Sequence, residues 1–338
     1  MTEQVKLKAK DFATDQEVRW CPGCGDYAIL KGVQSALANI GATPHNTVFV
    51  SGIGCSSRFP YYMETYGFHT IHGRAPAFAT GVKLTNPDLD VWLVTGDGDG
   101  LSIGGNHTMH VIRRNLDVQI LLFNNEIYGL TKGQYSPTSK VGTHTPSTPM
   151  GSVDAPLVPC HFALGAGARF IARGVDTDLK SLPGILARAK EHKGASFIEI
   201  YQNCIVYNDK TFDHFTDKKV AADRQLHAVH GEKLIFGKER NRGVIFNAET
   251  MGLEVVTIGE NGITEDDILV HDETNLNLAR LLVDIHGTDV PVVVGVIYCN
   301  PAESYETAVH NQINDAKAAN PKPSLNALLR KGRTWTVE

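Results

Sequence analysis

Short apolar runs alternate with longer segments of mixed polarity along the chain as far as residue 201. The short runs are expected to form strands and the longer segments helices. Strands that alternate with helices predict an α/β fold, with a mostly parallel sheet covered by helices on both faces. The expected strands are residues 47–51, 91–95, 118–123, 168–173 and 196–201, and the expected helices are residues 26–40, 76–84, 102–114, 156–164 and 179–191.

The pattern changes after residue 207, where polar residues dominate and the apolar runs become shorter. We therefore expect an α/β domain over residues 1–207 and a C-terminal extension over residues 208–338. The extension is expected either to cover the first domain or to contact another subunit. Its expected elements are β-like runs at 243–246 and 253–258, helices at 275–285 and 304–317, and a strand at 292–297.

Polar residues follow two expected strands at the points where the strands end. The strand at 91–95 leads into Gly96-Asp97-Gly98-Asp99-Gly100, and the strand at 118–123 leads into Asn124-Asn125. In parallel sheets, ligands bind beyond the carboxyl ends of the strands. Side-chain oxygens suit Mg²⁺, and a helix N-terminus attracts anions, so the pattern predicts a site for a diphosphate with a divalent metal. The alternative is a simple turn and a helix cap without a ligand.

Two of the cysteines, Cys55 and Cys204, are expected at this same edge of the sheet. Cys21 and Cys24 form a CPGC motif, and Cys55 and Cys204 follow expected strands. CPGC alone could be a redox pair, whereas four converging thiolates could hold zinc or an iron–sulfur cluster. The spacing does not choose among these possibilities.

Three basic or titratable side chains are further candidates. Arg58 and Lys132 lie in expected loops at the ligand edge, where either could bind a carboxylate or could simply be solvated. His72 follows a glycine-rich stretch and precedes a helix of small residues.

Composition narrows the possible partners and locations. The formal net charge is −5 and no basic run occurs, so nucleic acid is not an expected partner. No apolar stretch reaches the roughly 18 residues of a membrane span. The N-terminal residues lack the apolar core of a secretion signal, so a cytoplasmic protein is expected.

Several ordered motifs resemble the β subunit of 2-oxoacid:ferredoxin oxidoreductases, and the 2-oxoglutarate type in particular. The resemblance covers approximately residues 15 to 215 and is looser beyond them. The family has a thiamine-diphosphate-binding fold, which the resemblance implies for this chain. The motifs are CPGCG, SGIGCSSR, HGRAPAFATG, GDGDGLSIGGNH, RRN, NNEIYGLTKGQYSPTS and QNC.

The resemblance implies thiamine diphosphate, Mg²⁺ and one [4Fe–4S] cluster as cofactors. It assigns Mg²⁺ to the side chains of Asp97 and Asn125 and to the backbone carbonyl of Ile127. The remaining implied site residues are Cys21, Cys24, Cys55 and Cys204 for the cluster, and Ile53, Gly54, His72, Gly96, Gly98, Asp99 and Asn125 for thiamine diphosphate.

The implied activity is the oxidative decarboxylation of 2-oxoglutarate with coenzyme A to succinyl-CoA and CO₂. Single electrons pass through the cluster to ferredoxin, and the reaction can also run in reverse. Arg58 and Lys132 are expected to bind the substrate carboxylates or coenzyme A, since a bidentate arginine suits a carboxylate. The sequence shows no carboxylate that would activate the cofactor, so the resemblance implies a separate α subunit, in an αβ or α2β2 assembly.

Three other functions are possible for such a chain. The substrate could be pyruvate or a broad range of 2-oxoacids. A thiamine decarboxylase without electron transfer would need no cluster, and a zinc-stabilised scaffold would not be an enzyme at all.

Overall fold

Eight strands form the main sheet of the protein. A computed structural model describes residues 7–285, 290–322 and 324–337 of the 338-residue chain. The strands are β1 (Thr47–Ser51), β2 (Tyr66–His69), β3 (Asp90–Gly96), β4 (Gln119–Asn124), β5 (Phe170–Val175), β6 (Ser196–Tyr201), β7 (Gln225–Ala228) and β11 (Val292–Cys299). Their spatial order is β2-β1-β3-β4-β6-β5-β11-β7.

The main sheet is mostly parallel. Strands β1 to β6 all run in the same direction. Strand β11 runs antiparallel to β5, and β7 pairs in parallel with β11. The expected α/β class with a mostly parallel sheet is therefore confirmed.

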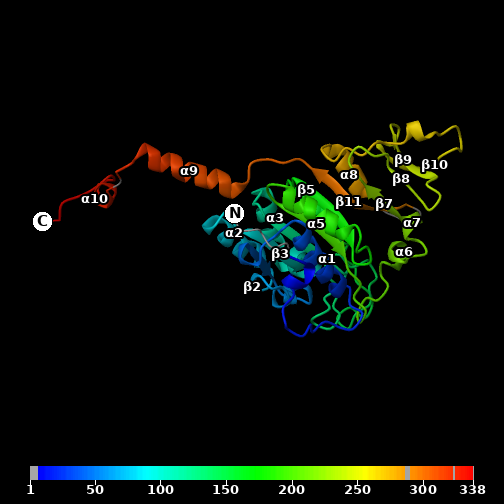
Figure 1. Ribbon diagram of the computed structural model, residues 1–338, viewed down its shortest axis with the longest axis horizontal. Coiled ribbons are helices and arrows are strands. Elements are labelled where there is room, and N and C mark those ends of the chain that lie inside the picture. Colours follow the sequence, from blue (N-terminus) through cyan, green and yellow to red (C-terminus); the bar gives the residue numbers. More distant parts are fainter. Residues whose placement is uncertain (1–6, 286–289, 323, 338) are drawn as a thin grey trace.

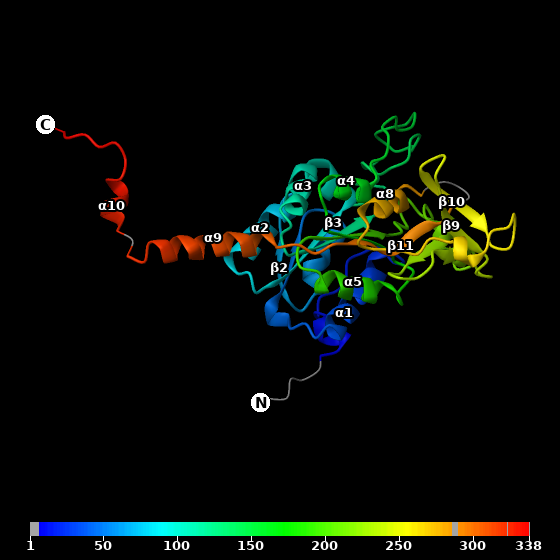
Figure 2. The ribbon, with the colours of Figure 1, turned by 90° about the horizontal axis from the view of Figure 1, so that it is seen from above.

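Helices cover both faces of this sheet (Figures 1 and 2). The alternation of side chains along β4 explains why both faces are apolar. Ile120 and Leu122 belong to one hydrophobic cluster, and Leu121 and Phe123 belong to the other. α1 (Asp26–Asn39) and α5 (Leu182–Glu191) pack on one face, and α2 (Ala75–Thr85), α3 (Gly105–Arg113), α4 (Pro159–Gly165) and α8 (Leu276–Asp284) pack on the other.

Most expected elements appear within a few residues of their expected bounds. The expected helix at 102–114 is divided into a π-helical turn, η4 (Asp99–Ile103), and α3. The expected helix at 156–164 begins only at Pro159, a residue that favours the first turn of a helix. The described residues also include four short 3₁₀ segments: η1 (Ala9–Phe12), η2 (Pro44–Asn46), η3 (Ser56–Tyr62) and η5 (Glu265–Asp267).

The chain beyond residue 207 contributes β7 and β11 to the main sheet. Two short helices, α6 (Asp213–Thr216) and α7 (Ala221–Arg224), precede β7. A separate antiparallel sheet contains β8 (Ile235–Phe236), β9 (Arg242–Asn247) and β10 (Gly252–Thr257). The domain boundary after residue 207 stays a prediction, and residues 1–6, 286–289, 323 and 338 of the two expected parts lie outside the described residues.

The last two helices extend away from the rest of the protein. They are α9 (Tyr305–Ala319) and α10 (Leu325–Leu329), and they project beyond the sheet in both views (Figures 1 and 2). Across the described ranges, no helix combines the length and the apolar character that crossing a membrane requires.

Candidate functional site

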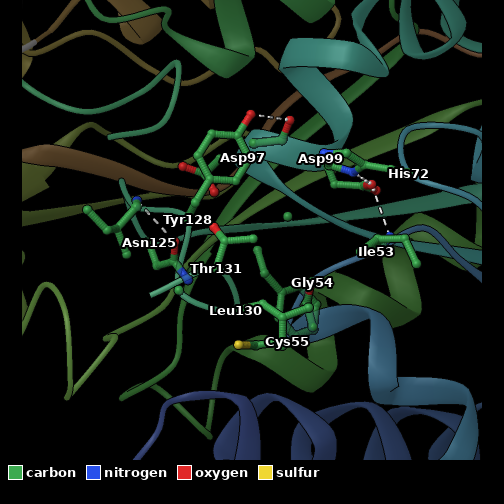
Figure 3. A pocket seen from close by; sticks show the side chains of 16 residues that line it. Ile53, Gly54, Cys55, His72, Asp97, Asp99, Asn125, Tyr128, Leu130 and Thr131 are labelled. Carbon is green, nitrogen blue, oxygen red and sulfur yellow. Dashed lines mark hydrogen bonds and ion pairs between the residues drawn. The ribbon is translucent and has the colours of Figure 1, made fainter. Parts of the chain in front are cut away.

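Two adjoining pockets lie at the carboxyl ends of β1, β3, β4 and β6. We call the first the glycine-rich pocket (Figure 3); it is lined by Ile53, Gly54, His72, Gly96, Asp97, Gly98, Asp99, Asn125, Ile127, Tyr128 and Thr131, among others. We call the second the cysteine pocket; it is lined by Trp20, Cys21, Cys24, Arg58, Lys132, Gln202, Cys204 and their neighbours. Cys55, Asn125, Gly129 and Leu130 line both pockets.

Asp97 is held rigidly at the glycine-rich pocket. Its side chain is buried, and Oδ2 accepts hydrogen bonds from Ser136 Oγ and Thr138 Oγ1, each at 2.6 Å. Burial raises the pKa of this carboxyl, and the two hydroxyl donors oppose that rise because they stabilise the charged form. The carboxylate therefore has a fixed orientation at the end of β3.

Asp99 connects three segments of backbone around the same pocket. Its Oδ1 accepts hydrogen bonds from Gly73 N at 2.7 Å and from Ile53 N at 3.0 Å, and it lies 2.5 Å from His72 Nδ1. Its Oδ2 accepts a bond from Thr95 Oγ1 at 2.6 Å. Since its partners are protein groups, Asp99 positions His72 and Ile53 (Figure 3). Direct contact of Asp99 with a diphosphate stays a prediction.

Asn125 lines the same pocket as Asp97 and has a fixed amide. Its Oδ1 accepts a hydrogen bond from Ile127 N at 3.2 Å, and its Nδ2 donates to Gln202 Oε1 at 2.8 Å. Asp97, Asn125 and Ile127 all line the glycine-rich pocket. The structure thus brings the three expected Mg²⁺ ligands to one pocket, and all three can offer oxygen, the donor that Mg²⁺ prefers.

A buried polar network supports Asp97 from behind. Thr138 Oγ1 also lies 3.0 Å from Asn124 Oδ1, and Asn124 Nδ2 donates to Glu199 Oε1 at 2.8 Å. Glu199 Oε2 accepts a bond from Arg173 Nε at 2.9 Å. These residues were not predicted as part of the site, although Thr138 lies in the SPTS segment that contributed to the resemblance. Buried charges in the expected strands at 168–173 and 196–201 were the available signal.

The four expected cluster cysteines line one pocket. A Cβ atom placed on Gly129 would lie 3.5 Å from Cys204 Sγ and 3.7 Å from Cys55 Sγ, so both sulfurs face the glycine. Burial raises the pKa of the Cys55 thiol to about 11 and raises that of Cys24 further. In the described part of the chain, no three His, Cys, Asp or Glu side chains are arranged as ligands of a single metal ion.

Arg58 and Lys132 both lie in the cysteine pocket and not among the residues that line the glycine-rich pocket. One guanidinium nitrogen of Arg58 donates to the Arg19 carbonyl at 3.4 Å. The two cations therefore share a pocket with the four cysteines.

Comparison with known proteins explains this arrangement. The family described as "Thiamine pyrophosphate enzyme, C-terminal TPP binding domain" matches residues 52–200, which include the residues that line the glycine-rich pocket but not Trp20, Cys21, Cys24, Gln202 or Cys204 of the cysteine pocket. A curated protein of Mycobacterium tuberculosis, 2-oxoglutarate oxidoreductase subunit KorB, is 49% identical over 100% of this chain and 90% of its own length. The chain belongs to the β-subunit family of the 2-oxoacid:ferredoxin oxidoreductases.

Further relatives of this β-subunit family agree. The β subunit of the 2-oxoacid:ferredoxin oxidoreductase of Saccharolobus solfataricus is 44% identical over 60% of this chain and 67% of that protein. A solved structure from Magnetococcus marinus, a 2-oxoglutarate:ferredoxin oxidoreductase with 2-oxoglutarate, coenzyme A and succinyl-CoA bound, is 30% identical. It covers 98% of both chains with a TM-score of 0.78. The family and the thiamine-binding α/β fold expected from the motifs are both confirmed.

Proposed function

We propose that the chain is the β subunit of an enzyme that oxidises 2-oxoglutarate with coenzyme A to succinyl-CoA and CO₂. Ferredoxin takes the two released electrons one at a time, and the reaction is reversible. The observation that carries this proposal is the shared wall between the glycine-rich and cysteine pockets, formed by Cys55, Asn125, Gly129 and Leu130. Two pockets with a common wall suit a reaction in which a substrate carbon in one pocket passes electrons to an acceptor in the other.

The glycine-rich pocket fits thiamine diphosphate with Mg²⁺. A buried carboxylate at Asp97, an amide at Asn125 and the backbone of Ile127 form an oxygen-rich set of ligands. We propose that His72, Gly96 and Gly98 contact the diphosphate, and that Ile53 and Gly54 lie beside the thiamine ring.

The cysteine pocket fits a [4Fe–4S] cluster, because four thiol side chains line it and four is the number such a cluster needs. When bound, thiamine diphosphate supplies the nucleophilic carbon and electron sink for releasing CO₂, and the cluster accepts single electrons. The chain itself contributes orientation: Asp99 holds His72 and Ile53, and Ser136 and Thr138 hold Asp97.

An α subunit is required to complete the site. Among the described residues, the acidic side chains that line the glycine-rich pocket are Asp97 and Asp99. The first is the proposed metal ligand, and the second is bonded to the loops around His72. We therefore propose that the carboxylate that activates the cofactor comes from a separate α subunit, in an αβ or α2β2 assembly.

Co-purification with the α subunit tests the proposal. The complex should contain thiamine diphosphate and iron, show a brown absorption that dithionite bleaches, and reduce an artificial electron acceptor with 2-oxoglutarate and coenzyme A. The isolated chain should turn over no substrate. Zinc without iron, or coenzyme-A-independent release of CO₂ without electron transfer, would contradict the proposal.

Pyruvate or a broad range of 2-oxoacids is the second candidate, because the Saccharolobus relative is named only as a 2-oxoacid enzyme. The ratio of kcat/KM for 2-oxoglutarate to kcat/KM for pyruvate separates the two. A ratio well above one supports 2-oxoglutarate, and a ratio near one supports the broader specificity.

A further inference from the structure

Gln202 lies between the two pockets. It directly follows β6, its backbone N–H donates to the Asn124 carbonyl at 2.9 Å, and its side chain is almost fully buried, with 1% exposed. Its side chain is in contact with the proposed metal ligand Asn125 on one side and with Cys24 of the cysteine pocket on the other.

The Gln202 side chain belongs to a series of hydrogen bonds in which each N–H group donates toward the cysteine pocket. The Ile127 N–H donates to Asn125 Oδ1, and Asn125 Nδ2 donates to Gln202 Oε1. Gln202 Nε2 then donates to Cys24 Sγ at 3.3 Å and to the Asn203 carbonyl at 2.6 Å. The amide groups are thus aligned from the glycine-rich pocket toward a sulfur.

Backbone groups at both ends fix this direction. The Ile127 N–H can only donate, so the atom of Asn125 that faces it must be the oxygen. The Asn203 carbonyl can only accept, so the atom of Gln202 that faces it must be the nitrogen. A reversed Gln202 amide would place its oxygen against the Asn203 carbonyl and its nitrogen against Asn125 Nδ2. The donor to Cys24 is therefore determined by the fold.

We infer that Gln202 is a positioning residue that connects the metal–diphosphate site to the iron–sulfur cluster. The inference rests on the proposed function. On one side, Gln202 holds the Asn125 amide so that its oxygen is directed at the metal, as groups behind a metal ligand commonly do. On the other side, its N–H bond to the Cys24 sulfur stabilises the more negative, reduced cluster, because hydrogen bonds to cluster sulfurs help set the reduction potential.

The expected effects of removing the amide follow from these two contacts. Gln202→Met keeps a similar length, but its thioether is only a weak acceptor toward Asn125 and cannot donate to Cys24. The reduction potential of the cluster should fall, and the Mg²⁺-dependent affinity for thiamine diphosphate should fall by roughly tenfold or more. If Gln202 only filled space, the substitution would lower neither the reduction potential nor the affinity for thiamine diphosphate.

The experiment uses the complex with the α subunit and measures two quantities. The midpoint potential comes from an anaerobic redox titration followed by electron paramagnetic resonance, and the dissociation constant of thiamine diphosphate comes from calorimetry at saturating Mg²⁺. Gln225→Met is the matched control, because Gln225 is also buried and donates to the Phe215 carbonyl at 2.8 Å, away from both pockets. Gln202→Asn is a second test variant, in which the amide is retained but withdrawn by one methylene group.

The outcomes separate the inference from the proposed function. A lower potential and weaker cofactor binding in both Gln202 variants, with wild-type values in Gln225→Met, support the inference. A wild-type potential in both Gln202 variants overturns it, and so does an equal shift in Gln225→Met. The midpoint potential is measured on the molecules that contain a cluster, so partial loss of the cluster does not obscure it. If the wild-type complex contains no cluster, the proposed function fails instead.

Discussion

At the scale of single residues, Asp97 and Asp99 show how hydrogen bonds give neighbouring carboxylates different roles. Only Gly98 separates them, and both are buried. Asp97 is held by the hydroxyls of Ser136 and Thr138 and faces the pocket. Asp99 is held by backbone groups and by His72, so it organises the wall of the pocket.

Thr138→Val should weaken cofactor binding. Valine keeps the shape of threonine but removes the donor to Asp97 Oδ2 at 2.6 Å. Loss of such a supporting contact typically lowers metal affinity by roughly 10- to 100-fold. Calorimetry of thiamine diphosphate binding to the α-containing complex, at several Mg²⁺ concentrations, measures the effect. Thr47→Val is the control: Thr47 is buried and donates to the Thr43 carbonyl, at the opposite end of the sheet. Equal losses in the two variants would contradict the role of Thr138.

Arg58→Met should raise the KM for 2-oxoglutarate far more than the KM for pyruvate. A guanidinium pairs well with the distal carboxylate of 2-oxoglutarate, which pyruvate lacks. The structure places Arg58 in the cysteine pocket, so the prediction requires the substrate to extend toward that side. Steady-state kinetics with both substrates provide the measurement. Arg19→Met changes an arginine that lines the same pocket and pairs with Glu17 at 2.8 Å. An equal effect on both substrates, or the same effect from Arg19→Met, would refute the assignment.

At the scale of elements, the buried strands could be predicted from the sequence, because burial gives them a regular apolar pattern. Strands β3 and β4 are continuous apolar runs because both faces of the sheet are covered, and their bounds were predicted within about two residues. Strand β2 was missed because it is only four residues long and all four are exposed, so it lacks the continuous apolar run of the buried strands. The segment that follows β4 hides the role of two of its residues for a similar reason: Ser136 and Thr138 bond to Asp97, which is distant in sequence, so no local pattern reveals them.

The same limit applies to the candidate site. The positions of Asp97, Asn125, Cys55 and Cys204 could be predicted because these residues follow strands whose ends meet at one edge, whereas Cys21 and Cys24 were assigned from the resemblance of the CPGC motif. The links among them could not. Gln202 is an ordinary polar residue in the sequence, and only the three-dimensional placement of Asn125 and Cys24 on either side gives it a role.

His192, at the end of α5, should make stability fall at acidic pH. It is 3% exposed, its ring packs on Phe170 of β5, and burial lowers its pKa to about 4. The unfolded chain accepts this proton below pH ~6.5, whereas the folded chain does so only near pH 4. Between these values each pH unit should cost up to about 1.4 kcal/mol of the free energy of unfolding.

The test compares urea unfolding at pH 7.5 and pH 5.5. In His192→Leu the dependence on pH should be weaker than in wild type, because the group that prefers to be protonated in the unfolded chain is gone. His45→Leu, at an exposed position, should retain the wild-type dependence. A wild-type pH dependence in His192→Leu would rule out this residue as the cause.

At the scale of the whole molecule, the protein has a sheet-centred body and a C-terminal arm. The first turns of α9 are fixed to the body: Glu306 is buried and accepts the backbone N–H of Asp117 at 3.2 Å, and His310 Nε2 lies 3.0 Å from the Leu84 carbonyl. Beyond them the chain leaves the body (Figure 2). The leucines of α10 are largely exposed. The body should therefore fold without α10 but depend on the start of α9.

Two truncations test this division. Deletion of residues 321–338 should change the free energy of unfolding by no more than about 0.5 kcal/mol, as is usual for exposed positions. Deletion of residues 303–338 should lower it by at least about 1 kcal/mol, because the buried N–H of Asp117 loses Glu306 as its acceptor. Urea unfolding followed by fluorescence of Trp20 and Trp92, both buried in the body, measures both. If the shorter deletion destabilised the chain as much as the longer one, α10 would have to pack on the body in solution, against the exposure of its leucines.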